Sequence, residues 1–347
     1  MRAASAEMAL ECFAQAYRAK TRAIIRCMPL LHPHMTTIRV LSLCPLTLRY
    51  LAYNLVLESE IALPELHSPE DHAHPLTPDV SIAYAGIDPR GIEDGQQLGP
   101  FLWVNRTSLW LHVPHVARFL VRNGCEILID PEPGIDEDSL RVFLLGSAFG
   151  ALLFQRGYLV LHGNAIRIGD QCMVCVGHSG AGKSTLAAGF MRRGYPVLAD
   201  DVVPVDAQCH ALPGFPRIKL WQDVADKLEI ATDDLRRIRP NTEKFNLPVT
   251  VEGAEKPLPI RWVYILDSDH IDDLRVEPIQ GLNRFQPLHN NTYRVRFLKG
   301  MALKSEHLKL CGQLAGKIRL ARITRPRVGF SLDQMIDRIL ADIAENP

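Results

Sequence analysis

Hydrophobic and polar residues alternate in short runs through the first third of the chain. Residues 37–41 and 101–104 are two such runs, and segments rich in Pro, Gly and Asp separate the runs, for example at 88–91. A period of two residues between apolar positions is typical of a β-strand with one buried face. The pattern therefore predicts a small β-rich N-terminal domain over residues 36–135, which ends at the Pro- and Gly-containing segment 131–134.

A longer apolar pattern begins after this boundary. Acidic residues at 136–138 suit a helix N-terminus, an apolar stretch follows at 142–154, and Gly157 comes after it. The stretch is too short to cross a bilayer, so we predict a buried helix that runs to about residue 155.

Strands and helices alternate over the rest of the chain. We expect a strand at 158–162, a hairpin of strands 165–168 and 172–176, a helix at 184–193 and a strand at 195–199. A strand at 262–266, a helix near 303–315, a strand at 318–323 and a helix from 331 to about 344 follow, with Pro326 between the last two. This order predicts an α/β catalytic domain over residues 136–347.

Composition limits the classes of partner. The chain has 347 residues, of which 47% are hydrophobic and 22% charged, as in a soluble globular enzyme. Lys and Arg number 39, as do Asp and Glu, so the overall charge gives no reason to expect nucleic acid or a membrane as partner. Any anion-binding site must therefore be local.

Eight cysteines are spread along the chain, and only Cys172 and Cys175 lie close together. A strand would point these two sulfurs to opposite faces, and no second pair or His cluster completes a zinc site. We therefore predict buried free thiols and a reducing, cytoplasmic location.

Residues 1–35 form an N-terminal extension to which the sequence assigns no role, and Met35 offers an alternative start site. The extension contains Arg and Lys residues but no continuous apolar segment, so we do not expect a secretory signal. The sequence is compatible with a homo-oligomer and does not define a number of subunits.

One segment has the pattern of a phosphate-binding loop. It reads Gly177-His178-Ser179-Gly180-Ala181-Gly182-Lys183-Ser184, is followed by Thr185, and fits G-x-x-x-x-G-K-[ST] without mismatch. Glycines let successive backbone N–H groups point at phosphate oxygens, beside the positive end of a helix. Lys183 would contact the β- and γ-phosphates and the Ser184 hydroxyl would bind Mg²⁺. The predicted strand before the loop and helix after it favour a nucleotide site over a simple glycine turn, with ATP and Mg²⁺ as cofactors.

An acidic pair, Asp200 and Asp201, ends the strand that follows the loop's helix. This strand can run beside the loop's own strand, which would bring at least one carboxylate to the bound phosphates. One carboxylate can hold Mg²⁺ while the other orients an attacking hydroxyl and accepts its proton. The alternative is a pair that only caps a turn.

Asp267 and His162 are further candidates for a role in the nucleotide site. Residues 262–267 form an apolar run that ends in Asp267, as a Walker B strand does, but further acidic residues follow and favour a buried strand that leads into a solvated turn. His162 ends the strand before the hairpin, which makes it the best placed of the 13 histidines. No Asn-Lys-x-Asp guanine-reading motif occurs, which argues against a GTPase.

Residues 158–206 resemble the catalytic domain of HPr kinase/phosphorylase. The shared features are His162-Gly163, the hairpin, the loop, Arg193-Gly194-Tyr195 and Leu198-Ala199-Asp200-Asp201, in the same order and spacing. The resemblance implies a P-loop kinase domain of the HPr kinase and phosphoenolpyruvate carboxykinase type, with a mixed sheet. It also implies Asp200 as catalytic base, Asp201 as a supporting or metal-binding residue, and His162 as a residue that supports the site or senses phosphate.

The match to true HPr kinase weakens outside this block. Residues 212–221 lack the glycine and asparagine pattern of that enzyme's next motif, which puts phosphorolysis and HPr as substrate in doubt. From about residue 50 the chain is more similar to HPr-kinase-related proteins of bacterial clusters that make ribosomal peptides. Lasso-peptide tailoring kinases, which phosphorylate a Ser hydroxyl of a precursor peptide, belong to that group.

A basic stretch follows the acidic pair. Arg217, Lys219 and Lys244 are candidate contacts to the transferred phosphate or to the acceptor, because cations there stabilise charge in the transition state. The alternative is that they are ordinary solvated charges.

The leading hypothesis is therefore an ATP-dependent kinase that acts on a Ser or Thr hydroxyl of a peptide or small protein. Within the same chemistry, HPr itself or a small hydroxylated metabolite is the alternative acceptor. A third hypothesis, from another class, is a nucleotide-dependent switch that hydrolyses ATP slowly and reports it to a partner.

Overall fold

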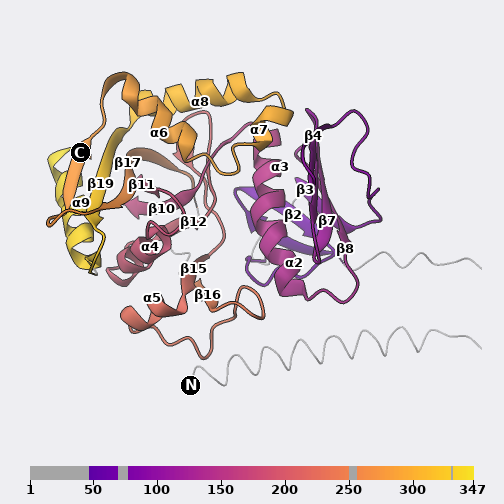
Figure 1. Cartoon of the computed structure of the whole chain (residues 1–347), viewed down its shortest axis with the longest axis horizontal. Helices are drawn as coiled ribbons and strands as arrows, with labels where there is room; N and C mark the ends of the chain where they lie inside the picture. The colour runs from indigo at the N-terminus through magenta and orange to yellow at the C-terminus, as the bar shows by residue number, and fades with distance from the viewer. Residues whose placement is uncertain (1–46, 69–76, 250–255, 330) are drawn as a thin grey trace, which may run out of the picture. The chain divides into compact units, whose positions relative to one another are not determined.

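The computed structural model of the chain describes residues 47–68, 77–249, 256–329 and 331–347. The predicted extension at 1–35 and the predicted strand at 37–41 lie outside the described residues. The chain from Pro45 onward forms one compact unit. Its helices and mixed sheets give an α/β structure (Figure 1).

The first sheet is built from the short alternating runs. Its strands lie in the order β1-β2-β3-β8-β7-β6-β5-β4. The β2–β3 and β3–β8 pairs are parallel and the others antiparallel. The bounds are β1 Leu48–Ala52, β2 Leu55–Ser59, β3 Val80–Tyr84, β4 Gln96–Gly99, β5 Leu102–Val104, β6 Ser108–Val113, β7 Ala117–Arg122 and β8 Glu126–Pro131.

A continuous helical segment covers this sheet, as Figure 1 shows. It consists of α2 (Glu137–Phe143), a π-helical turn η1 (Leu144–Ala148) and α3 (Phe149–Gln155), which confirms the predicted helix. The Asp136 carboxylate caps it by accepting a hydrogen bond of 2.7 Å from the Ser139 backbone N–H. Sheet and helices share one hydrophobic core across the predicted boundary at residues 135 and 136. That domain boundary therefore stays a prediction.

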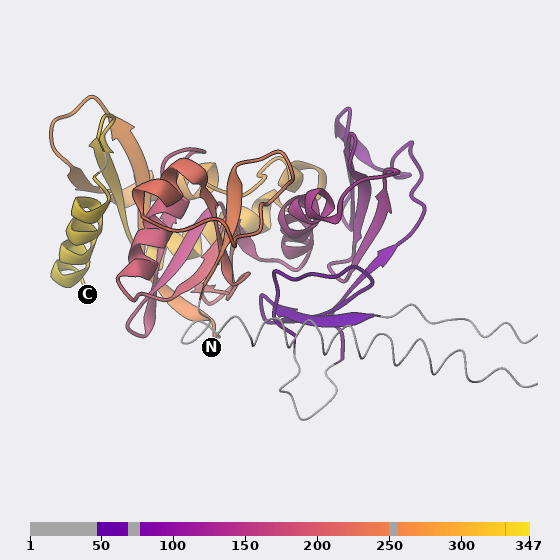
Figure 2. The same ribbon diagram turned by 90° about the horizontal axis from the view of Figure 1, so that it is seen from below.

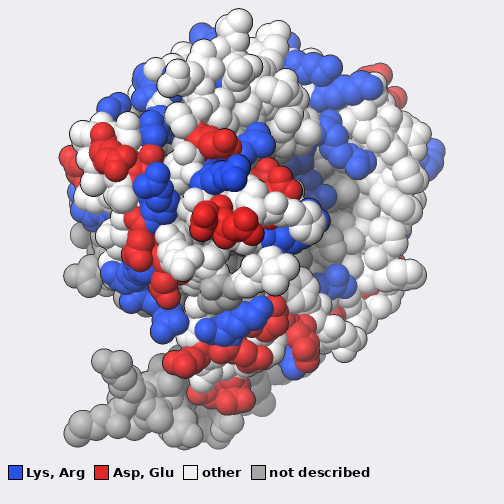
Figure 3. Space-filling model, turned by 60° about the vertical axis from the view of Figure 1, so that its left-hand side comes forward, with Lys and Arg blue, Asp and Glu red and all other residues white. Residues whose placement is uncertain are grey.

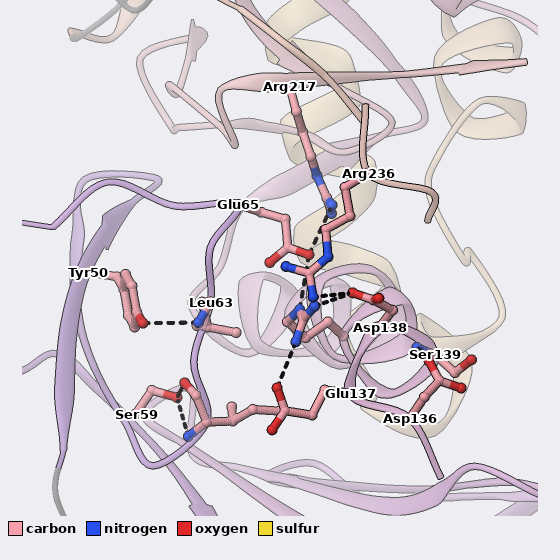
Figure 4. A network of polar contacts seen from close by, with 12 residues as sticks. Tyr50, Ser59, Leu63, Glu65, Asp136, Glu137, Asp138, Ser139, Arg217 and Arg236 are labelled. Atoms are coloured by element: carbon pink, nitrogen blue, oxygen red, sulfur yellow. Dashed lines mark hydrogen bonds and ion pairs between the residues drawn. The ribbon is translucent and has the colours of Figure 1, made fainter. Parts of the chain in front are cut away.

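A charge network joins three parts of the chain, and Figure 4 shows Glu65, Glu137, Asp138 and Arg217, which belong to it. Arg141 of α2 is only 1% exposed and pairs with Glu65 at 3.0 Å, with Glu137 at 3.2 Å and with Asp138. Glu65, from the segment after β2, also lies 3.5 Å from Arg217. The network thus ties the region of the first sheet to the helix and to the segment that holds the predicted basic residues.

The second sheet carries the predicted loop. Its main strand order is β12-β10-β11-β17-β14-β13-β9, and β19 and β18 continue it beyond β17. The bounds are β9 Leu159–Leu161, β10 Gly163–Ile168, β11 Gln171–Val176, β12 Val197–Asp200, β13 Val203–Val205, β14 His210–Ala211, β17 Leu258–Asp269, β18 Arg275–Pro278 and β19 Arg319–Pro326. The hairpin of β10 and β11 is where it was predicted. Pro326 is the last residue of β19, not part of the connection after it.

Helices cover both faces of this sheet (Figures 1 and 2). On one face α4 and α9 pack on Met173 and Cys175 of β11, and on the other α6 and α8 pack on Val174 and its neighbours. The alternation confirms that Cys172 and Cys175 face opposite ways as buried free thiols, and burial raises the pKa of Cys172 to about 12. The helix bounds are α4 Lys183–Arg192, α6 Phe285–Asn290 with the 3₁₀ turn η2 Gly281–Arg284 before it, α7 Phe297–Gly300, α8 Lys304–Lys317 and α9 Leu332–Glu345.

A two-stranded antiparallel ribbon stands apart from both sheets. It pairs β15 (Arg217–Trp221) with β16 (Lys244–Pro248), and the short helix α5 (Gln222–Lys227) follows β15. No helix in the described part of the chain is both long and apolar enough to cross a membrane. On the face shown in Figure 3, Lys and Arg are interspersed with Asp and Glu, so neither sign of charge dominates.

Candidate functional site

The predicted phosphate loop connects β11 to α4. The strand ends at Val176, as the sequence predicts, and the helix begins at Lys183, one residue before its predicted start. Gly180 and Gly182 have φ angles of +83° and +101°, which other residues rarely adopt. These angles turn the backbone into the helix N-terminus, where free N–H groups and the helix dipole favour an anion.

Lys183 lies inside the loop that precedes it. Its Nζ donates hydrogen bonds to the carbonyl oxygens of Gly177 at 2.8 Å and His178 at 3.0 Å. Burial lowers its pKa below the usual lysine value, although Asp201 and Asp200 oppose this effect. From the neighbouring strand β10, the Asn164 side-chain amide donates to the Lys183 carbonyl oxygen and so fixes the start of the helix. The ammonium group is thus held where phosphate oxygens would meet it.

The acidic pair lies near the loop, but the strand that carries it is not the neighbour of the loop strand. β12 does not run beside the loop strand β11, because β10 lies between them and pairs antiparallel with both. The prediction that the two strands are neighbours was therefore wrong. Since β10 is antiparallel to each, β11 and β12 still run in the same direction and end at the same edge of the sheet. Asp200 consequently lies at the N-terminus of α4, where the Ser184 hydroxyl donates to its two carboxylate oxygens at 3.1 and 3.3 Å.

Asp201 points elsewhere, because its backbone has a left-handed φ of +76°. Its carboxylate pairs with the Lys219 Nζ at 2.8 Å and lies 3.4 Å from Nδ1 of His162. Nδ1 of His162 is also 3.0 Å from the Asp201 carbonyl oxygen, so the tautomer protonated at Nδ1 donates there. The two adjacent carboxylates therefore have separate partners.

The environments of the two carboxylates push their pKa values apart. Burial, and then the charge of Asp201, raise the pKa of Asp200. Burial also acts to raise the pKa of Asp201, but the charge of Lys219 and its hydrogen bond to the carboxylate outweigh it and hold that pKa below the usual range. Burial lowers the pKa of His162, so its imidazole is mainly neutral at pH 7. Asp201 is thus ionised at neutral pH, beside a neutral histidine.

The ribbon of β15 and β16 contributes to the same pocket as the loop. Lys219 and Trp221 of β15 and Lys244 of β16 line a pocket of about 330 Å³ together with the loop, the acidic pair and His162. The Lys219 backbone N–H also donates to Asp200 at 3.0 Å. The pocket is lined by His162, Ser179, Gly180, Gly182, Lys183, Ser184, Thr185, Asp200, Asp201, Lys219, Leu220, Trp221, Asp223, Val224 and Lys244.

The remaining predicted residues lie at or near this pocket without lining it. Gly177, His178 and Ala181 belong to the loop backbone. Arg217 is 6% exposed, bonds to Asn246 at 2.8 Å and faces Glu65. The structure thus brings Lys219 and Lys244 to the pocket but not Arg217.

The competing Asp267 lies on β17, the strand that runs parallel beside β11. Its side chain is 39% exposed and pairs with Arg322 at 3.4 Å. It does not line the pocket.

Two residues near the loop have no local sequence signal that marks them. Asn164 is fully buried and holds the start of α4. Trp221 lines the pocket although its side chain is half exposed. Only the pairing of β10 with β12 and of β15 with β16 brings them to the site.

No family model and no curated protein match the sequence. Among solved structures the chain is similar to the Hpr(Ser) kinase/phosphatase from Coxiella burnetii, with 14% identity, 53% of this chain and 95% of that chain covered, and a TM-score of 0.26. A likeness with so low a TM-score carries no argument about function, so any conclusion depends on the geometry of the site.

Proposed function

We propose that the chain is a phosphotransferase that binds ATP with Mg²⁺ and transfers the γ-phosphoryl group to a Ser or Thr hydroxyl of a peptide or small protein. The main support is the pair of adjacent carboxylates, of which one contacts the loop's Ser184 and the other contacts Lys219 and His162. A site that only binds nucleotide needs one metal carboxylate, whereas transfer to a hydroxyl benefits from a second beside the acceptor.

The loop side of the pocket suits the triphosphate. Backbone N–H groups at the N-terminus of α4 and the Lys183 ammonium group would hold the phosphates. A hydroxyl and a carboxylate, those of Ser184 and Asp200, lie together here, and Mg²⁺ prefers such oxygen ligands. The sequence suggested Asp201 for the metal, but the geometry favours Asp200. When bound, the ion would neutralise charge on the phosphates.

The surroundings of Asp201 suit the acceptor. Asp201 is ionised and therefore able to orient a hydroxyl and accept its proton. Lys219, paired with it, would stabilise charge on the transferred group. His162 keeps the Asp201 segment in place through its contact with the Asp201 carbonyl oxygen. This assignment gives Asp201 the role of base that the family resemblance implied for Asp200.

The test compares three carboxylate-to-amide variants. The protein is incubated with γ-labelled ATP, Mg²⁺ and candidate acceptors, namely Ser-containing precursor peptides of ribosomal peptide clusters and HPr, and the products are analysed by mass spectrometry. Asp201→Asn should retain ATP binding and lose roughly 10²–10⁴-fold in transfer rate. Asp200→Asn should raise the Mg²⁺ concentration needed for half-maximal activity. Asp267→Asn, outside the pocket, should behave as wild type.

Two results would contradict the proposal. If ATP binds but no acceptor is labelled, and neither Asp variant alters slow hydrolysis, a nucleotide-dependent switch explains the site better. If Asp200→Asn loses transfer without any change in Mg²⁺ dependence, Asp200 is the base and the roles assigned here are reversed.

A further inference from the structure

Trp221 has no part in the phosphate chemistry, yet it lines the same pocket. Its side chain is 51% exposed, whereas Trp110 and Trp262 are 2% and 4% exposed. It ends β15 at the point where the chain turns into α5. A large aromatic side chain that is half exposed inside a concave site is a feature of ligand contact more than of folding.

The ribbon fixes where Trp221 stands relative to the phosphates. Lys219 and Trp221 are two residues apart on β15, so they share a face and lie roughly 6.6 Å apart along the strand. Lys244 is the cross-strand partner of Trp221, and its Nζ is 5.3 Å from the ring centroid. Burial, and then the charge of Lys219, lower the pKa of Lys244, while Asp201 and Asp200 oppose this effect. Lys244 therefore contacts the indole ring in the same pocket as the acidic pair.

One pocket holds both the phosphate loop and the indole ring. It is lined by Lys183 and Ser184 at the N-terminus of α4 and by Trp221, Asp223 and Val224 where β15 meets α5. A ligand whose phosphates are held by the loop would thus meet Lys244 and an aromatic surface in the same pocket. This set of groups suits a polyanion that ends in a flat aromatic ring.

We propose that Trp221 is the stacking surface for the base of the nucleotide, and that Lys244 contacts the phosphates between that base and the loop. This inference rests on the proposed phosphotransferase and makes its donor a nucleoside triphosphate, not pyrophosphate or polyphosphate. Stacking tolerates any base because each has a π-face, so Trp221 sets the preference for a nucleoside without choosing adenine over guanine.

Calorimetry on the full chain tests this with two ligands. ATP and inorganic tripolyphosphate, each with Mg²⁺, are titrated into wild type, Trp221→Ala and Trp221→Phe. Loss of one stacked base corresponds to roughly a 5- to 150-fold loss of affinity. Trp221→Ala should lose about this much for ATP and nothing for tripolyphosphate, and Trp221→Phe should restore most of the loss.

Tryptophan fluorescence provides an independent readout. ATP should quench the emission of wild type and of Trp103→Phe, a matched variant at a partly exposed tryptophan of the first sheet. It should not quench Trp221→Phe, while tripolyphosphate should quench none of the three.

The outcomes separate the two proposals. If neither ligand binds wild type, the phosphotransferase proposal fails, and the inference about Trp221 fails with it. If both ligands bind wild type equally and Trp221→Ala changes neither, the phosphate site stands and the inference about the base is wrong. If Trp221→Ala leaves ATP binding intact but raises the KM for the acceptor, Trp221 contacts the acceptor and the inference is again overturned.

Discussion

Arg141 offers the sharpest test of how this fold is held together. Its guanidinium pairs with three carboxylates and is 1% exposed, and Arg141→Met would keep the length of the side chain while removing its charge. The carboxylate of Glu65, which is 7% exposed, would then keep only its longer contact of 3.5 Å to Arg217. Removal of one partner of a buried ion pair costs about 3–5 kcal/mol, because the other charge stays buried without full compensation.

The control is the same substitution at an exposed site of the same network. Arg236 pairs with Asp138 at 2.8 Å, but its side chain is 48% exposed. Exposed pairs contribute about 0–1 kcal/mol, so Arg236→Met should change stability by no more than that. Urea unfolding followed by circular dichroism gives both free energies of unfolding. The reasoning is refuted if Arg141→Met is no less stable than Arg236→Met.

Burial lowers the pKa of His307 to about 4, so between pH 6.5 and 4 the unfolded chain binds a proton that the folded chain does not. Stability should therefore fall by about 2 kcal/mol from pH 7 to pH 5, and His307→Gln should remove this dependence in urea unfolding. In Gly177→Ala the new Cβ would lie 2.8 Å from the Leu266 carbonyl oxygen, and the affinity for ATP should fall roughly tenfold in calorimetry. Gly169→Ala, in the hairpin turn with nothing within 4 Å, should leave that affinity unchanged. Gly312→Ala, inside α8 with nothing within 4 Å, should raise the free energy of unfolding by about 0.5–1 kcal/mol.

The local parts of the site could be predicted from the sequence because their signals lie within a few residues. The turn at Gly169, whose φ is +64°, joins the two strands of the hairpin as expected. The glycine loop and the helix that starts at Lys183 depend only on neighbouring residues. The hydrophobic alternation of β11 likewise predicts that Cys172 and Cys175 face opposite ways.

The long-range parts could not be predicted, because pairing partners far apart in the chain decide them. Whether β12 lies beside β11 or beside β10 depends on which free strand edge it meets, and its own sequence fits either. The same holds for the ribbon, where Lys219 pairs across to Asn246. Arg217 and Lys219 lie on one face of β15, yet only Lys219 reaches the pocket, because Glu65 from the region of the first sheet holds Arg217.

The acidic pair shows how backbone geometry separates two identical side chains. Asp200 is the last residue of β12 and follows the pleat of the strand toward Ser184. Asp201 has a φ of +76°, which costs most residues about 1 kcal/mol or more and which Asp tolerates better than most. This turn sends its carboxylate to the ribbon, where Lys219 keeps it ionised. Two neighbouring aspartates thus contact different partners. Asp200→Asn should therefore raise the Mg²⁺ concentration needed for half-maximal activity, whereas Asp201→Asn should lower the rate of phosphoryl transfer.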